Sequence, residues 1–269
     1  MKYRRAAVAG LLAAASLALG ACTSKTATGQ SGPGGVPDPA QSPAVALTNA
    51  VAALRDTGYD VSVSRGSAGA SLFTTGVGSA DPKANKASLE IKGTSGDGDI
   101  DIAAIQVGGS LWTKIDAGPL DARDGIDPTK WLLLDPSKLT APSSRPFDMS
   151  GSDDTFGVSG LLRSVADLRR VDATHLAGTV DLTASTGVSA PSPADLAHAG
   201  DDAKKTPLRV SLDAQGRLRE VDIDADGFAK GLTRSMSFTD FGSPAPVTAP
   251  SAADVAPAPA SVYDLFNAG

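Results

Sequence analysis

The chain has few of the residues on which metal sites and disulfide scaffolds depend. It contains one cysteine and two histidines among 269 residues. A single cysteine leaves no partner for an intrachain disulfide. His175 and His198 lie far apart in the sequence, and neither has neighbours with metal-ligand spacing. We interpret each histidine as a surface or structural residue, and we expect no metal and no cofactor.

Catalytic motifs are missing as well. No serine stands in a G-x-S-x-G pattern, no G-x-x-x-x-G-K-[ST] loop is present, and no G-x-G-x-x-G links a strand to a helix. An acid–base pair would need a cleft lined by convergent polar groups. We therefore expect that the protein is not an enzyme.

Basic charge and aromatic side chains are also scarce. The net charge is -6, and removal of Lys2, Arg4 and Arg5 from the 24 basic residues leaves 21 against 30 acidic ones, or about -9. An acidic surface disfavours nucleic acid and anionic lipid headgroups as electrostatic partners. Aromatic residues make up 4% of the chain. The core is therefore expected to be aliphatic, which suits flexible alkyl chains better than flat rings.

One acidic motif resembles part of a calcium loop. Asp222, Asp224, Asp226 and Gly227 follow the D-x-D-x-D-G spacing, but Thr233 stands at the twelfth position, where a calcium loop has a bidentate glutamate. The preceding residues alternate as in a strand. We interpret the motif as a solvated strand end, with cation binding as the open alternative.

The first 22 residues have the pattern of a lipoprotein signal. Lys2, Arg4 and Arg5 precede an apolar stretch from Ala6 to Leu19, which ends in Leu-Gly-Ala-Cys22. The apolar stretch is shorter than the roughly 20 residues of a membrane span. We predict a signal peptide over residues 1–21 and a Cys22 that carries diacylglycerol and palmitate. Two or more acyl chains would hold the protein stably on a membrane. The alternative is an ordinary secretory signal with an incidental thiol.

The rest of the chain divides into a tether and one domain. Residues 22–42 are rich in Gly, Pro, Ser and Thr and are predicted to be a flexible tether. Residues 43–269 are predicted to form a single domain with a Pro/Ala-rich C-terminal tail after Gly242.

Periodicity assigns the elements of that domain. Helical spacing is present over Pro43–Asp56, over Val158–Leu168 and in a short segment after Ser192-Pro193, and a last helical turn is expected at Ser261–Phe266. Alternation with period two predicts strands at residues 59–63, 89–91, 100–102, 111–115, 176–182, 208–212, 218–223 and 236–238. Asp213-Ala-Gln-Gly216 is typical of a hairpin turn. The pattern indicates an α+β fold with an antiparallel meander.

Several segments resemble the LppX/LprG-type lipoproteins of mycobacteria and related actinobacteria. Val107-Gly-Gly-Ser-Leu-Trp-Thr-Lys114 is similar to that family's VG-x-x-LY-x-K strand, with Trp112 where the family often has Tyr. Trp131-Leu-Leu-Leu-Asp-Pro-Ser-Lys-Leu139 is similar to its W-x-x-(L/V)-D-P-x-x-L segment. Further matches are the 161–180 region, the 207–218 hairpin and Phe238-Thr-Asp-Phe-Gly242 with Val247-Thr-Ala-Pro250. The resemblance spans residues 45–255.

The resemblance implies a strongly curved antiparallel sheet, a half-barrel, with helices packed on its concave face around an apolar cavity. It also implies a protein on the outer face of the cytoplasmic membrane that carries a long-chain lipid or acylated glycolipid across the cell envelope, with an envelope transporter as a further partner. The expected cavity-lining residues are Ile100, Ile102 and Leu111 on the sheet and Val158, Leu161, Leu162, Val165 and Leu168 on the helix. The alternative is a tethered protein-interaction module with a filled core and no lipid ligand.

Overall fold

The computed structural model describes residues 41–65, 73–95, 98–118, 125–140, 155–185, 191, 193–228 and 232–267. All the described residues belong to one compact unit. The predicted signal peptide, Cys22 and the predicted tether up to residue 40 lie outside the described residues. Within the described ranges, no helix combines the length and hydrophobicity needed to cross a bilayer.

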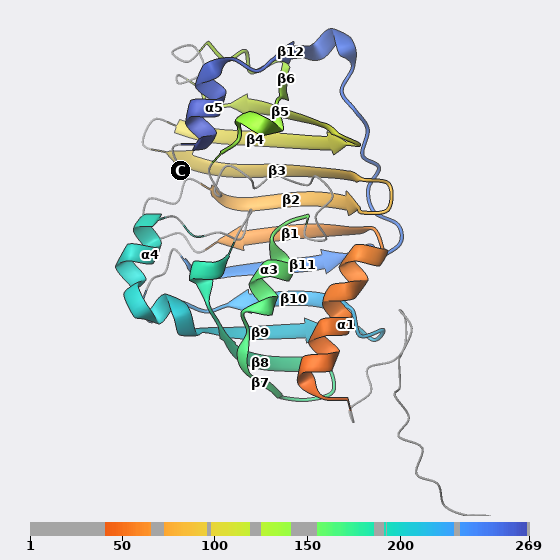
Figure 1. Cartoon of the computed structure of the whole chain (residues 1–269), viewed down its shortest axis with the longest axis vertical. Helices are drawn as coiled ribbons and strands as arrows, with labels where there is room; N and C mark the ends of the chain where they lie inside the picture. Colours follow the sequence, from red (N-terminus) through yellow and green to blue (C-terminus); the bar gives the residue numbers. More distant parts are fainter. Residues whose placement is uncertain are drawn as a thin grey trace, which may run out of the picture. The chain divides into compact units, whose positions relative to one another are not determined.

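Twelve strands of the described residues form one curved, unclosed sheet (Figure 1). Their order is β12-β6-β5-β4-β3-β2-β1-β11-β10-β9-β8-β7, and neighbouring strands are antiparallel except for the parallel pair β12 and β6. The bounds are β1 Tyr59–Arg65, β2 Phe73–Asp81, β3 Lys86–Ser95, β4 Gly98–Val107, β5 Ser110–Asp116, β6 Trp131–Leu134, β7 Ala166–Arg170, β8 His175–Val180, β9 Thr206–Leu212, β10 Leu218–Ile223, β11 Arg234–Thr239 and β12 Val255–Pro257. The predicted fold class, a curved antiparallel sheet with a few helices, is confirmed.

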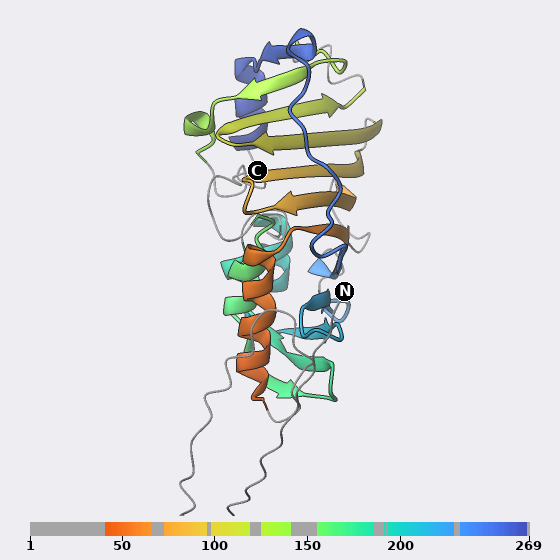
Figure 2. The ribbon, with the colours of Figure 1, turned by 90° about the vertical axis from the view of Figure 1, so that its right-hand side faces the viewer.

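The described helices are few and short. They are α1 Pro43–Asp56, α3 Val158–Arg163, α4 Pro193–Ala199 and α5 Ala260–Asn267, and the 3-10 helices are η1 Pro136–Lys138, η3 Leu182–Ala184, η5 Gly200–Lys205 and η7 Ala252–Asp254. Helix α1 contacts β7, β10 and α3. Figure 2 shows α1 and α3 on the same side of the sheet. These helices therefore cover the end of the sheet formed by β7–β11.

Helix α1 has the bounds that periodicity predicts, because its ends are marked in the sequence. Ser42 has an extended backbone and its Oγ accepts a hydrogen bond from the Val45 N–H at 3.4 Å, while Pro43 occupies the first turn. The helix ends at Asp56, and the extended backbone of Thr57 turns the chain towards β1. The predicted short helix after Pro193 and the predicted C-terminal turn are confirmed as α4 and α5; Ser192 lies outside the described residues.

The predicted helix over Val158–Leu168 is wrong in its second half. Helix α3 ends at Arg163, where the Ser164 hydroxyl donates to the Leu161 carbonyl at 2.7 Å and to the Asp181 carbonyl at 3.2 Å. Residues 166–170 then form β7 and pair with β8. Asp167 has a φ of 52°, which breaks helical geometry. Strand pairing at the edge of the sheet therefore decides the structure of residues 166–170, although the helical spacing of apolar residues continues for three turns.

The Pro/Ala-rich segment after Gly242 packs along the ends of the strands. The Gly242 N–H donates to the Gly58 carbonyl at 2.7 Å, and the Ala245 N–H donates to Asp60 Oδ1 at 3.0 Å. The Lys130 Nζ then donates to the Ala253 carbonyl at 3.0 Å. In Figure 2 the segment crosses the strand ends between β11 and β12. It therefore links the two halves of the sheet and delivers β12 to its edge.

Candidate lipid-binding face

One side of the sheet is apolar from β5 to β8. The side chains on it belong to residues that stand directly opposite one another in neighbouring strands. We call this side the inner face. One row across it reads Ile115, Ile102, Ile91, Gly76, Val63, Met236, Val221, Val210 and Leu176. Apart from Gly76, these residues belong to or pack against one cluster of buried hydrophobic side chains.

The three predicted sheet-side residues lie together on the inner face. Ile100 and Ile102 are on β4 and Leu111 is on β5, and all three are buried. Alternation along these strands places Asp101 and Lys114 on the opposite side. The burial pattern of the two strands follows the period of two that the sequence predicts.

The predicted helix-side residues divide into two groups. Val158, Leu161 and Leu162 lie on α3 and are buried. Val165 follows the helix, and Leu168 is on β7; both are half-buried and pack against the core. Their assignment to a helical face is therefore wrong, because the helix ends before them.

The structure does not place the two predicted sets opposite each other. In Figure 1, α3 lies in front of β10 and β11, whereas Ile100, Ile102 and Leu111 lie on β4 and β5. All the fully buried members belong to the same core cluster. The α3 residues therefore cover a different part of the inner face from that formed by Ile100, Ile102 and Leu111.

Small residues open space over β2, and an aromatic side chain occupies part of it. Gly76, Gly78 and Ala80 occupy the inner-face positions of this strand. A Cβ added to Gly78 would lie 3.1 Å from the ring of Phe156 and 2.6 Å from the Ser88 carbonyl oxygen. Phe156, which is 1% exposed, therefore packs against the bare backbone of β2.

Phe156 belongs to an aromatic cluster that composition did not predict. The Tyr59 ring lies 6.1 Å from that of Phe156, 5.8 Å from that of Phe238 and 5.9 Å from that of Phe241, between centroids. Edge-on and tilted contacts at these distances are favourable. Two of its members, Phe238 and Phe241, stand in the Phe238-Thr-Asp-Phe-Gly segment, whose sequence indicates the family resemblance but not this packing. Among the described residues the core is thus largely aliphatic, with this cluster and Tyr263 as its buried aromatic side chains.

Buried polar side chains in β4 and β5 are bound to neighbouring backbone or amide groups. The Gln106 amide donates to Asn85 Oδ1 at 3.1 Å, and the Thr113 hydroxyl donates to the Ala103 carbonyl at 3.0 Å. These hydrogen bonds lower the free-energy cost of burying the two polar side chains, and neither side chain carries a charge. The inner face of β4 and β5 therefore presents no charged group.

The candidate calcium motif ends β10 and is held by Thr233. The Thr233 hydroxyl donates to Asp226 Oδ1 at 2.7 Å, and the Ala225 N–H donates to the Thr233 hydroxyl at 3.0 Å. Asp222 lies within β10, and Asp224 and Asp226 follow it exposed. Across the described ranges, no three potential metal ligands gather. The exposure of Asp224 and Asp226 at the end of β10 agrees with the interpretation as a solvated strand end.

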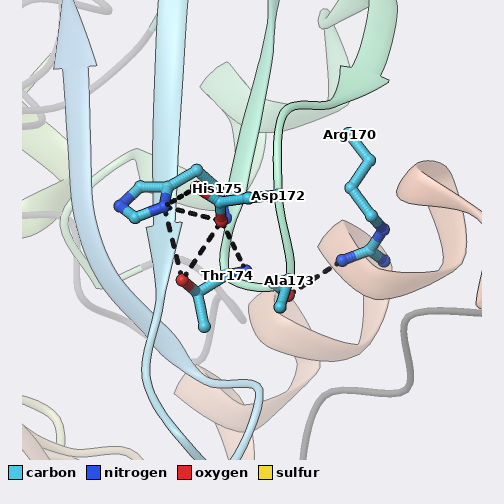
Figure 3. A network of polar contacts seen from close by, with 5 residues as sticks. All are labelled: Arg170, Asp172, Ala173, Thr174 and His175. Atoms are coloured by element: carbon cyan, nitrogen blue, oxygen red, sulfur yellow. Dashed lines mark hydrogen bonds and ion pairs between the residues drawn. The ribbon is translucent and has the colours of Figure 1, made fainter.

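His175 forms a polar network at the β7–β8 turn (Figure 3). Its Nδ1 lies 2.8 Å from the Asp172 carboxylate, which also accepts from the Thr174 and His175 N–H groups, each at 2.9 Å. These hydrogen bonds, with that of Thr174 largest, lower the pKa of Asp172 to about 2. Nearby, the Arg170 guanidinium donates to the Ala173 and Gln41 carbonyls. The network fixes a turn and lies on the surface, and His198 is likewise exposed on α4.

The class of fold is therefore an open, curved, mostly antiparallel sheet with helices on one apolar side. Among solved structures, the chain is similar to LprF from Mycobacterium bovis, with a TM-score of 0.45, 15% identity and coverage of 81% of this chain and 99% of that one. It is also similar to the lipoprotein LppX from Mycobacterium tuberculosis, with a TM-score of 0.41, 15% identity and coverage of 77% and 98%. Both are lipoproteins of the LppX/LprG family, which the sequence resembles. No family model and no curated protein matches the chain.

Proposed function

We propose that the protein is a membrane-anchored lipoprotein that binds a long-chain lipid or acylated glycolipid on the inner face of its sheet. In this proposal the diacylglycerol on Cys22 holds the protein on the outer face of the cytoplasmic membrane, and the domain carries its ligand across the cell envelope. An envelope transporter is the proposed exchange partner. The proposal includes no catalytic step.

The apolar row across the inner face is the observation that supports the proposal. It runs through nine neighbouring strands of an unclosed sheet, and the described helices α1 and α3 cover its β7–β11 end. A surface of this kind is suited to extended alkyl chains, which need no directional contact. Removing a methylene group from water contributes about 0.8 kcal/mol. Ten methylenes would thus supply about 8 kcal/mol before the costs of association.

A second function is favoured by Phe156. Its ring fills space over Gly78 and packs on Tyr59, as a side chain of a closed core would. If the remaining inner-face residues are packed as densely, the domain would be a tethered protein-interaction module without a lipid. The two functions differ in how the inner face of β4 responds to a larger side chain.

A matched pair of substitutions on β4 separates the two functions. Ile102 points to the inner face and is 6% exposed, whereas Ile105 lies on the opposite side of the same strand and is only half-buried. In a lipid carrier, Ile102→Trp should reduce bound lipid in native mass spectrometry and keep the thermal midpoint of unfolding. In a filled core it should destabilise the domain by about 1–3 kcal/mol. Ile105→Trp should leave lipid loading unchanged in both cases.

A further inference from the structure

The side of the sheet away from the inner face carries an apolar area at one end, which we call the outer patch. Its members are Ala103, Ile105 and Val107 on β4, Trp112 on β5, Trp131 and Leu133 on β6, and Val255 and Pro257 on β12. All of them are half-buried or exposed, and Leu133 is 42% exposed. Helices α1 and α3 lie on the other side of the sheet (Figure 2). The outer patch therefore faces away from the core.

Strand register joins the members of the outer patch into one surface. A row across four strands reads Ile105, Trp112, Leu133 and Pro257. Beside that row, Val255 stands opposite Trp131. Directly opposed side chains in a sheet are close enough to touch. The outward residues of β1 and β11 are polar instead, mainly serines. The apolar surface is thus confined to the end of the sheet formed by β4, β5, β6 and β12.

Both tryptophans of the chain, Trp112 and Trp131, belong to the outer patch. An indole ring is largely apolar but carries an N–H donor, so tryptophan is enriched where an apolar phase meets water. Two kinds of surface have this character: the interfacial region of a lipid bilayer and the contact surface of a partner protein. The tryptophans alone favour neither of these two partners.

Lysine side chains at the outer patch favour the bilayer. Lys114 is the next outward residue after Trp112 on β5, and Lys86 on β3 stands opposite Val107. Both lysines are half-buried. Lysine is depleted in the interfaces between proteins. At a bilayer, its aliphatic stem can lie among apolar groups while its ammonium group extends to the phosphate layer. A lysine within an apolar patch therefore suits a lipid surface better than a protein.

Exposed carboxylates border the outer patch and indicate how it would be oriented. Asp101 and Asp116 stand opposite each other at the far end of β4 and β5, and Glu90 on β3 stands opposite Ala103. These groups favour water. The net charge of -6 also disfavours long-range attraction to anionic lipids. Contact with a bilayer would therefore be apolar and would involve the hairpin end of β4 and β5, with the carboxylates left in water.

We propose that the outer patch docks on the interfacial region of the bilayer to which Cys22 attaches the chain. This rests on the anchor in the proposed function and adds which face of the domain meets the membrane. Residues 23–40 separate Cys22 from Gln41. They can span up to about 60 Å, so the attachment leaves the domain free to turn any face to the bilayer. An anchored domain is already concentrated at the surface, and weak docking is then sufficient. Docking would bring the β4–β6 end of the domain beside the lipid.

The test uses tryptophan fluorescence, because both tryptophans lie in the outer patch. The mature acylated chain is incorporated into phosphatidylcholine vesicles, either plain or with acyl chains brominated near the headgroup, and flotation confirms the attachment. Bromine should quench the emission of the wild type at least about twofold, since tethering makes the docked state dominant. The Cys22→Ala chain, mixed with the same vesicles, should show little quenching because docking without the anchor is weak.

Substitutions then locate the docking surface without removing a tryptophan. Leu133→Gln should lower the ratio of docked to undocked chain about fivefold, because one leucine is no longer removed from water. Pro257→Gln, at an exposed position of the same row, should act in the same direction. The matched control is Val77→Gln on β2. Val77 is 53% exposed on the same side of the sheet but lies beyond Glu90, outside the outer patch, so quenching should be unchanged.

The outcomes separate this inference from the function on which it rests. A wild type that floats with the vesicles but is not quenched would overturn the docking and leave the anchor intact. Equal quenching of the wild type, Leu133→Gln and Cys22→Ala would also overturn it, since a brominated lipid bound on the inner face would act on all three. Protection of the tryptophans that rises with the density of the chain, without quenching by bromine, would replace the bilayer with a second copy. A mature chain that does not float would overturn the anchor and this inference together.

Discussion

At the scale of single residues, the packing of β2 depends on the absence of a side chain at Gly78. An added Cβ would lie 2.6 Å from the backbone oxygen of Ser88, which cannot move without shifting β3. We expect Gly78→Ala to lower the free energy of unfolding by about 1–3 kcal/mol. Gly109→Ala is the matched control, since nothing lies within 4 Å of its added Cβ. Equal denaturation midpoints for the two variants would contradict this packing.

The turn at Asp172 gives a prediction of pH dependence. Because its pKa in the folded state is about 2, below the ordinary 3.8, the charged carboxylate stabilises the turn above about pH 4. That contribution should disappear as the pH falls from about 4 to about 2. An NMR titration of the Asp172 carboxyl should give a pKa near 2, and the difference in thermal midpoint between wild type and Asp172→Asn should shrink over the same interval. An ordinary pKa near 4 would show that the turn hydrogen bonds do not form in solution.

At the scale of elements, helix α1 begins where the predicted tether ends. A chain that starts at Gln41 retains the Ser42 cap and the Gln41 carbonyl that Arg170 binds at 3.1 Å. It should therefore have the thermal midpoint of the full mature chain. Ser42→Ala in the same chain should lose about 1 kcal/mol with the cap. A drop of several degrees on removing residues 22–40 alone would show that the tether packs on the domain.

Elements with strong local signals could be predicted from the sequence. Helix α1 has a capping serine and a proline in its first turn, and β4 and β5 alternate between buried and exposed residues. The β9–β10 hairpin is fixed by Asp213, whose carboxylate accepts from the Gln215 and Arg217 N–H groups, and by Gly216 with a φ of 75°. In these cases the information lies within a few residues of the element.

Elements that depend on distant partners could not be predicted. Strand β2 was missed because Gly76 and Gly78 hide its alternation, and its inner side is completed by Phe156, far along the chain. The local spacing of apolar residues predicts a helix where β7 stands, because the pairing of β7 with β8 leaves no local signal. Arg65 and Arg234 likewise stand opposite each other only through the register of β1 and β11, which no local pattern shows. The predicted sheet-side lining residues are found on one face because strand alternation is local.

At the scale of the whole molecule, the proposed anchor at Cys22 predicts where the domain works. Cys22 is the chain's sole cysteine, and the residues before it have the lipobox pattern. We expect the native protein to fractionate with membranes and Cys22→Ala to move to the soluble fraction, since the acyl chains supply the attachment. A variant that stays membrane-bound after cleavage of the signal peptide would refute the anchor and leave the fold unaffected.

The central claim is that the inner face holds a lipid, and the most direct measurement is the mass of what the protein carries. The mature chain is purified without a tag or detergent from cells that export it, and it is measured by native mass spectrometry before and after organic extraction. The account predicts a species heavier than the bare chain by the mass of one amphiphile, which the extract identifies as a long-chain lipid or acylated glycolipid. A chain that is fully folded, that has the mass of the polypeptide with its anchor alone, and that takes up no lipid from added vesicles would contradict the account.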